Sequence, residues 1–381
     1  MKNINKLLIL FFLAFAAQSI FISCKKDNAS DHGVRLIKYV RVTNPESSDS
    51  LLIGANQGNL IAIMGENLQG AKELWFNNRK ASLTPTYMTS TTILVRVPVP
   101  IPTEITNKIK ILFSAGDSLL YDFQVQISKP FINSMECEYV NAGDVATFYG
   151  AFFYQPLTVA FEGGVNGEIV SVTDKILKVR IPTGVQPGRV TVTTNFGTNK
   201  SNFWFRDNRN IFISSDPYTG WSGANFVVAN PGPGDPPAIN GNYIRVNQAI
   251  GGWQWTPIAE GDPYGMPGSK NIPDEAILKP EDYNLKFELN TRKPFNANVL
   301  KINAGLSNGF NNDNYQWKPP YDTKGVWKTV IIPYEDITKS YGGKQTVNKD
   351  GYYTRILFHG PGDLNCDMSF DNFRIVPKVL K

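Results

Sequence analysis

Hydrophobic and polar residues alternate along short stretches of the chain, and the same order of stretches occurs twice in succession. The first series predicts strands at 58–68, 73–76, 92–97, 108–113 and 121–127. The second series predicts strands at 143–150, 157–161, 176–181, 188–193 and 202–205. A period of two residues, with one apolar and one polar face, is typical of strands in a β-sandwich. We therefore expect two consecutive sandwich domains, at residues 34–128 and 129–206.

The composition changes after Asp207, where five of the seven tryptophans and a proline-rich stretch at 231–237 are found. Alternating segments continue, and they predict strands at 243–247, 284–289, 299–303, 327–332, 353–358 and 369–376. Segments with helical periodicity are few, and Gly and Pro are frequent throughout the chain. The sequence therefore predicts an all-β protein whose third domain covers residues 207–381.

The N-terminus is typical of a secretion signal, because Lys2 and Lys6 precede an apolar run at 7–17 that is too short to span a bilayer. The segment at 21–24 resembles a lipobox that ends at Cys24, with Phe21 where Leu is usual. We expect a signal peptide at 1–23, a lipid on Cys24 and a tether at 24–33. Acyl chains on Cys24 would hold the mature chain on a membrane.

Composition excludes several classes of function. The formal net charge is only +5 over 381 residues and the basic residues are scattered, so we expect no nucleic-acid partner. Only His32 and His359 are present, which is too few for a histidine zinc site. Cys137 and Cys366 lie far apart, so a disulfide framework is not expected. No catalytic residue, metal site or cofactor is predicted, although oxygen ligands in turns leave a calcium ion open.

Glycoside hydrolysis requires two suitably spaced carboxyl groups, and the acidic residues of the third domain lie mostly in turns beside Pro, Gly or Asn. None of them is distinguished by its neighbours. His359, next to Phe358 and Gly360 at a strand end, fits a turn or packing role better than a catalytic base. A hydrolytic enzyme therefore stays possible in principle but has no motif in its favour.

Aromatic residues in loops give a stronger signal, because a flat ring exposed on a rigid β-surface matches the apolar face of a sugar. Trp253 and Trp255 share a face if they lie on a strand, yet Gly251, Gly252 and Pro257 flank them as they would flank a loop. We expect at least one of the two to be an exposed platform. Trp327, in contrast, is expected in the core.

A second candidate platform follows the asparagine-rich turn at 308–314. Trp317 precedes two prolines and is expected to be exposed, with short polar groups nearby for sugar hydroxyls. Trp221 and Tyr264, in glycine-rich loops, are weaker candidates. The full set of candidate glycan-binding residues is Trp253, Trp255, Trp317, Tyr321, Tyr264, Trp221, Asn312, Asp313 and Gln316.

Both repeats resemble the immunoglobulin-like IPT/TIG domain, on the strands that end before Pro98 and Pro182 and on the closing pair Phe203 and Phe205. The arrangement of Cys24, the two repeats and the motifs DPYTGW, INGNYIRV, GGWQW and SFDNFRIV resembles lipidated B-type surface glycan-binding proteins of polysaccharide-utilisation systems. The resemblance implies a C-terminal sandwich of the xyloglucan-binding type. It also implies an outer-membrane lipoprotein that faces the exterior, beside a glycan importer and a surface glycanase.

Three functions remain open at this point. The first is non-catalytic capture of a plant β-glycan, with xyloglucan, mixed-linkage glucan and mannan as candidates. The second is a surface endoglycanase, and the third is an adhesin or scaffold whose loop aromatics meet a protein. A buried pair of carboxyl groups beside the aromatic loops would favour the enzyme.

Overall fold

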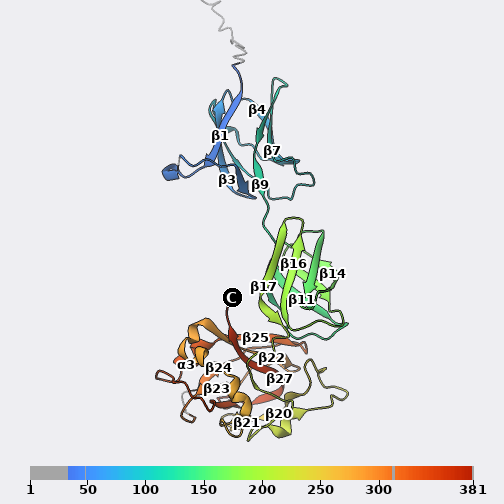
Figure 1. Ribbon diagram of the computed structural model, residues 1–381, viewed down its shortest axis with the longest axis vertical. Helices are drawn as coiled ribbons and strands as arrows, with labels where there is room; N and C mark the ends of the chain where they lie inside the picture. The colour runs from blue at the N-terminus through green and yellow to red at the C-terminus, as the bar shows by residue number, and fades with distance from the viewer. Residues whose placement is uncertain (1–32, 48, 311–313, 380–381) are drawn as a thin grey trace, which may run out of the picture. The chain divides into compact units, whose positions relative to one another are not determined.

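The computed structural model describes residues 33–47, 49–310 and 314–379 (Figure 1). The predicted signal peptide, Cys24 and His32 lie outside the described residues. The chain divides into two compact units, 1–128 and 129–381. Among the described residues, no helix combines the length and apolar character needed to cross a bilayer.

The described part of the first unit is a β-sandwich with its hydrophobic core between two sheets. One sheet has the order β1-β3-β6, formed by Leu36–Val42, Leu60–Glu66 and Thr92–Arg96. The other has the order β5-β4-β7-β8, formed by Arg79–Ala81, Ala71–Phe76, Lys108–Phe113 and Ser118–Asp122. A short parallel pair joins β2 (Gly54–Asn56) to β9 (Gln124–Gln126). Alternate residues of β7, namely Ile109, Ile111 and Phe113, fill the core, as the period of two predicts.

The second unit begins with another sandwich, drawn in green in Figure 1. Its first sheet has the order β10-β11-β15-β14, with strands Phe131–Met135, Val145–Ala151, Ile176–Arg180 and Glu168–Val172. Its second sheet has the order β13-β12-β16-β17, with strands Val165–Asn166, Leu157–Phe161, Gly188–Thr194 and Gly197–Phe205. Phe203 and Phe205 of the closing strand are buried in its core.

The C-terminal sandwich packs a larger sheet on a smaller one around the most extensive core. The larger sheet has the order β19-β20-β27-β22-β25, and β18 pairs with β27. Its strands are Val227–Val228, Tyr243–Ile250, Leu364–Pro377, Tyr283–Thr291 and Lys328–Pro333, with Ile211–Ile213 as β18. The smaller sheet has the order β21-β26-β23-β24, with strands Thr256–Gly261, Tyr353–Phe358, Leu300–Leu306 and Tyr315–Trp317. Two short helices, α2 (Asp274–Leu278) and α3 (Tyr334–Lys339), complete the domain.

Buried charges join the two sandwiches of the second unit. Arg374 of β27 is fully buried, and its guanidinium lies 2.7 Å from the carboxylate of Glu138 and 2.8 Å from that of Glu288. Lys286 of β22 also reaches Glu138, at 2.6 Å. Glu138 follows β10 in the second sandwich, whereas the other three residues belong to the C-terminal sandwich. We call Glu138, Lys286, Glu288 and Arg374 the inter-sandwich ion cluster.

A small hydrophobic cluster lies at the same interface and includes Cys137, Tyr139, Tyr243 and Trp327. The core position expected for Trp327 is confirmed, since its side chain is 6% exposed and its indole N–H donates to the carbonyl of Pro237. Cys137 and Cys366 are both buried and both free. Folding of this unit therefore depends on packing and on buried polar pairs.

Candidate functional site

The loop between β20 and β21 carries Trp253 and Trp255, whose side chains are 60% and 50% exposed. Trp253 has a positive φ of 62°, and its backbone N–H donates to the carbonyl of Gly360 at 2.7 Å. The side chain of Gln254 accepts from the N–H of Gly251, which closes the loop on itself. The expectation that this segment is a loop with exposed indoles is confirmed.

His359 lies next to both indoles and fixes their spacing. Its ring centre is 5.5 Å from that of Trp253 and 5.3 Å from that of Trp255, in edge-to-face geometry in both cases. His359 directly follows β26, and its N–H donates to the carbonyl of Val299. The imidazole is half-buried, which agrees with the packing role predicted for it.

Aromatic contact continues from this loop along the outer face of the smaller sheet. The guanidinium carbon of Arg355, on β26, lies 5.2 Å from the ring centre of Trp255 and 3.7 Å from that of Phe310. Phe310 in turn meets Trp221 edge-to-face at 6.1 Å. We call this row the aromatic strip, and its members are Trp253, His359, Trp255, Arg355, Phe310 and Trp221.

Arg355 keeps its position because it is paired with Glu260 of the neighbouring strand β21. Its Nε donates to Oε1 of Glu260 at 2.7 Å, and the hydroxyl of Ser222 donates to the other carboxylate oxygen at 3.3 Å. Glu260 is 9% exposed. Two nitrogens of Arg355 thus meet one oxygen of a largely buried carboxylate, which holds the guanidinium in one orientation between the neighbouring rings.

Trp221 is 56% exposed and is held by contacts of its own loop. Its backbone N–H donates to the carbonyl of Glu260 at 2.7 Å. Tyr218 donates its hydroxyl to the carbonyl of Ser222, and burial raises the pKa of Tyr218 to about 12, so the hydroxyl stays a neutral donor. The side chain of Trp221 is therefore exposed on a loop whose backbone is anchored to β21.

Tyr264 is 81% exposed and lies in the neighbouring loop. The carboxylate of Asp262 accepts from the N–H groups of Tyr264 and Gly265, at 3.1 Å and 2.6 Å. A side chain at Gly265 would collide with the indole nitrogen of Trp221, so the loop and that indole are in contact. The structure thus places Tyr264 in the loop next to Trp221, and Phe310 and Arg355 connect Trp221 to Trp255.

Polar side chains lie on the same face of the smaller sheet. Arg355 pairs with Asn303 of β23, and Lys301 of β23 pairs with Gln316 of β24. Successive residues of a strand point to opposite faces, and the neighbours Leu300, Ile302 and Trp317 are in the core. Lys301, Asn303 and Gln316 therefore lie on the same face as Arg355, where Asn303 is buried and Gln316 is exposed. Asn312 and Asp313 lie outside the described residues.

The expected exposure of Trp317 is wrong. Its side chain is only 5% exposed and belongs to the core of the C-terminal sandwich. The ring stacks on Phe295 at 5.3 Å, and Tyr321, which is 40% exposed, covers it at 4.2 Å. Because β24 pairs with β23 up to residue 317, the strand alternation turns this indole inward before the two prolines end the strand.

Sequence reasoning missed Phe310 and Arg355 as neighbours of the tryptophans. A signal for Arg355 was present, because Tyr353, Arg355 and His359 occupy alternating positions on β26 and its extension. Phe310 had no such signal, since it lies in a loop whose return to the sheet depends on the tertiary fold. Within the described ranges, no group of three or more His, Cys, Asp or Glu side chains is arranged to hold a metal ion.

Comparisons with known proteins agree on the architecture. A structure of the surface glycan-binding protein PbSGBP-B from Prevotella bryantii has a TM-score of 0.66 and 22% identity, and covers 91% of this chain and 99% of that one. A second crystal structure, determined with a xylogluco-oligosaccharide, has a TM-score of 0.51 and 16% identity. The match covers 91% of this chain and 100% of that one. At these identities the likeness shows the fold, which is all-β with several sandwich domains.

Sequence comparison gives two further findings. An IPT/TIG domain-containing protein from Bacteroides ovatus is 32% identical over 155 residues, which are 39% of this chain. The match spans only 30% of the length of that curated relative. Residues 205–377 match the family model described as the surface glycan-binding protein B xyloglucan binding domain, a family of binding proteins rather than enzymes. Residues 205–377 are therefore a domain of the surface glycan-binding protein B xyloglucan-binding type.

Proposed function

We propose that this protein captures a plant β-glycan at the cell surface without cleaving it, and that the aromatic strip is the binding surface. The observation that carries the proposal is the row of exposed indoles held rigidly by His359, Arg355 and Glu260. Rigid rings lose little entropy when a sugar stacks on them. The neighbouring Lys301 and Gln316 supply donors and acceptors for sugar hydroxyls.

The affinity of the aromatic strip for a glycan can be estimated from the apolar area that a sugar covers. Covering one indole face removes enough apolar area from water to contribute about 1 kcal/mol, at roughly 25 cal/mol per Å2. Three exposed tryptophans, namely Trp221, Trp253 and Trp255, then favour affinities in about the micromolar to millimolar range. Weak contacts repeated along a polymer are suitable for retention on a surface from which the ligand must later be released.

The charge arrangement at the strip favours binding over hydrolysis. A hydrolytic carboxyl group must give or take a proton, or attack the sugar. Both oxygens of Glu260 are engaged, by Arg355 and by Ser222. The carboxyl groups whose pKa is raised by burial, Glu288 and Asp371, lie instead on the larger sheet. An endoglycanase at this strip would need a different set of acids.

Xyloglucan is the ligand that we expect first, because the family model that matches residues 205–377 is named for it. Mixed-linkage glucan and mannan stay as alternatives, since stacking on an indole discriminates weakly between β-linked sugars. We further propose that a lipid on Cys24 holds the chain on the outer membrane, facing the exterior. There it would deliver glycan to an outer-membrane importer and a surface glycanase.

Variants of the strip test the proposal. In affinity gel electrophoresis of residues 25–381 with soluble xyloglucan, we expect Trp255→Ala to weaken binding about fivefold, and Trp253→Ala together with Trp255→Ala to weaken it about thirtyfold. Tyr87→Ala is the control, because Tyr87 is 53% exposed and belongs to the other compact unit of the chain. Equal retardation of the double variant and the control would show that glycan binds elsewhere.

A further inference from the structure

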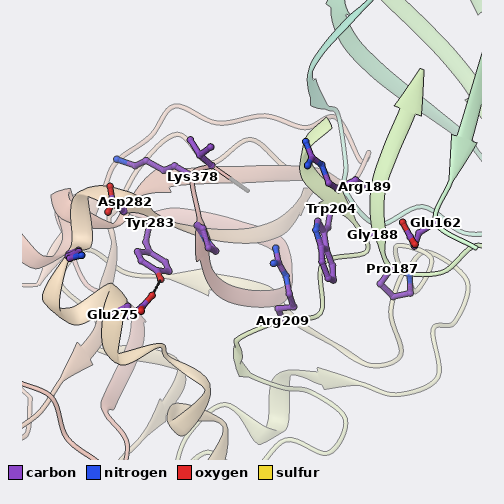
Figure 2. A pocket seen from close by; sticks show the side chains of 13 residues that line it. Glu162, Pro187, Gly188, Arg189, Trp204, Arg209, Glu275, Asp282, Tyr283 and Lys378 are labelled. Carbon is purple, nitrogen blue, oxygen red and sulfur yellow. Dashed lines mark hydrogen bonds between the residues drawn. The ribbon is translucent and has the colours of Figure 1, made fainter. Parts of the chain in front are cut away.

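A second candidate site lies between the second sandwich and the C-terminal sandwich, within the unit 129–381 (Figure 2). This cleft has a volume of about 800 Å3, within the range of pockets that hold small ligands. The second sandwich contributes Arg189 and Trp204, and the C-terminal sandwich contributes Asp282 and Tyr283. None of the residues that line it belongs to the aromatic strip.

The indole of Trp204 is fixed before any ligand arrives. Arg209 stacks on it, with the guanidinium carbon 3.8 Å from the ring centre. Two nitrogens of Arg209 each lie 2.8 Å from the carboxylate of Asp207, which is 2% exposed. Trp204 also pairs with Arg189 across β16 and β17, and the Nε of Arg189 donates to the carbonyl of Ser201 at 2.7 Å. The ring stays half-exposed at the cleft.

Ion pairs and hydrogen bonds also fix the positions of the two walls relative to each other. The inter-sandwich ion cluster crosses the interface with four charged side chains, all at most 7% exposed. The hydroxyl of Thr329 adds a link, because it accepts from the N–H of Glu138 at 2.8 Å and donates to Glu288 at 3.0 Å. A cleft between walls fixed in this way is pre-formed, which lowers the cost of binding.

Charges of both signs surround the apolar surface of the cleft. The lining carboxylates are Glu162, Glu275 and Asp282, and the lining cations besides Arg209 are Arg189, Lys279 and Lys378. A ligand with a strong charge of either sign would meet side chains of its own sign. A neutral ligand with an apolar face and several hydroxyl groups, which both donate and accept, suits both kinds of side chain.

We propose that this cleft is a second glycan subsite, which takes a neutral oligosaccharide segment of the polymer that the aromatic strip captures. The class of ligand in this inference rests on the proposed function. The location of the subsite rests on Trp204 and on the mixed charges of the cleft. Two sites on one protein increase the retention of a long chain beyond the affinity of either site, because the second contact is intramolecular. Short oligosaccharides lack this gain.

Isothermal titration with a xyloglucan oligosaccharide separates the two sites. The unaltered chain is expected to bind at two sites, and the double variant Trp253→Ala, Trp255→Ala at one weaker site. Adding Trp204→Ala to the double variant is expected to lower the remaining affinity about fivefold. Trp75→Ala is the matched control, because Trp75 also lies on a sheet strand beneath a cation, with Lys80 5.8 Å from its ring centre.

A second variant guards against loss of folding at Trp204. Asp282 is exposed at the cleft, so Asp282→Ala leaves packing intact and is expected to weaken the same residual site. A single site in the unaltered chain, or no residual binding in the double variant, would overturn the second subsite and leave the proposed function standing. If the double variant binds as tightly as the unaltered chain, the strip is not the binding surface. If that binding is then lost when Trp204→Ala is added, the cleft is still supported as a glycan site.

Discussion

Individual tryptophans of the C-terminal sandwich are exposed or buried according to the backbone that carries them. Trp253 and Trp255 lie in a loop that is closed by its own hydrogen bonds, so no strand alternation turns them inward. Trp317 lies at the end of a paired strand and is stacked in the core. The prolines that follow end strand β24 beyond Trp317, so the pairing of β24 with β23 still directs the side chain of Trp317 inward.

Replacing Trp317 by alanine should therefore affect stability. A large aromatic side chain removed from a core costs about 3–5 kcal/mol, whereas a change at an exposed position costs less than about 0.5 kcal/mol. We expect Trp317→Ala to lower the free energy of unfolding by an amount in the first range, and Trp255→Ala to leave it nearly unchanged. Urea unfolding measures both, and equal stability of the two variants would contradict the core assignment.

The exposure of Trp253 and Trp255 could be predicted from their sequence neighbours, because glycines and proline flank the pair. The position of Trp317 could not, since its flanks also signal a turn and only the pairing of β24 with β23 decides its direction. Phe310 reaches the strip through a loop, and the partnership of Arg355 with Glu260 depends on the register of β21 and β26. Contacts of this kind depend on the assembled sheet.

Strands with regular alternation were the most predictable elements. β7, β12, β15 and β16 occupy the ranges that alternation predicts, to within one residue. β1, β10 and β21 were missed, and in each of them a register shift interrupts the period of two. A bulge places two successive residues against one partner, so the polar and apolar positions fall out of step.

The outer face of the larger sheet is unusual because its side chains are charged yet buried. Asp371 of β27 pairs with Glu288 of β22 and is 5% exposed. Burial, together with the charge of Glu288, holds the pKa of Asp371 well above its usual value, although Arg374 acts in the opposite direction. Within the described residues, its Oδ2 has no hydrogen-bond partner.

The raised pKa of Asp371 should make the stability of the fold depend on pH. A carboxyl group whose pKa is higher in the folded state than in the unfolded state binds its proton more tightly in the folded state. Its contribution to the free energy of unfolding is complete below the unfolded pKa of about 3.9 and is lost as pH rises toward the folded pKa. We expect the free energy of unfolding to be lower at about pH 8 than at about pH 5. Asp371→Asn should reduce that difference in urea unfolding, and parallel pH profiles would rule out this role.

In the whole molecule, the unit 129–381 combines two sandwiches, of which the C-terminal one carries the strip, and the inter-sandwich ion cluster joins them. Arg374 is its central member, because both Glu138 and Glu288 depend on it. Removing one partner of a buried ion pair leaves an uncompensated charge and costs about 3–5 kcal/mol. The cluster should therefore be sensitive to single substitutions.

Arg374→Met is expected to lower the free energy of unfolding by about 3–5 kcal/mol, because Glu288 stays buried without a cation and Glu138 keeps only Lys286. The comparison is Lys339→Met, which breaks the exposed pair with Glu335 and should leave stability nearly unchanged. Both changes remove one cation from an ion pair, so the contrast isolates the effect of burial. Similar melting curves for the two variants would show that the cluster contributes little.

The central claim, capture of a β-glycan without cleavage, is tested most directly by affinity gel electrophoresis of residues 25–381 against xyloglucan, mixed-linkage glucan and mannan. A parallel assay for new reducing ends accompanies each polysaccharide. The account predicts retardation by at least one β-glycan, with xyloglucan first, and no increase in reducing ends. Retardation with new reducing ends would establish an endoglycanase, and migration unchanged by every glycan would favour an adhesin or scaffold.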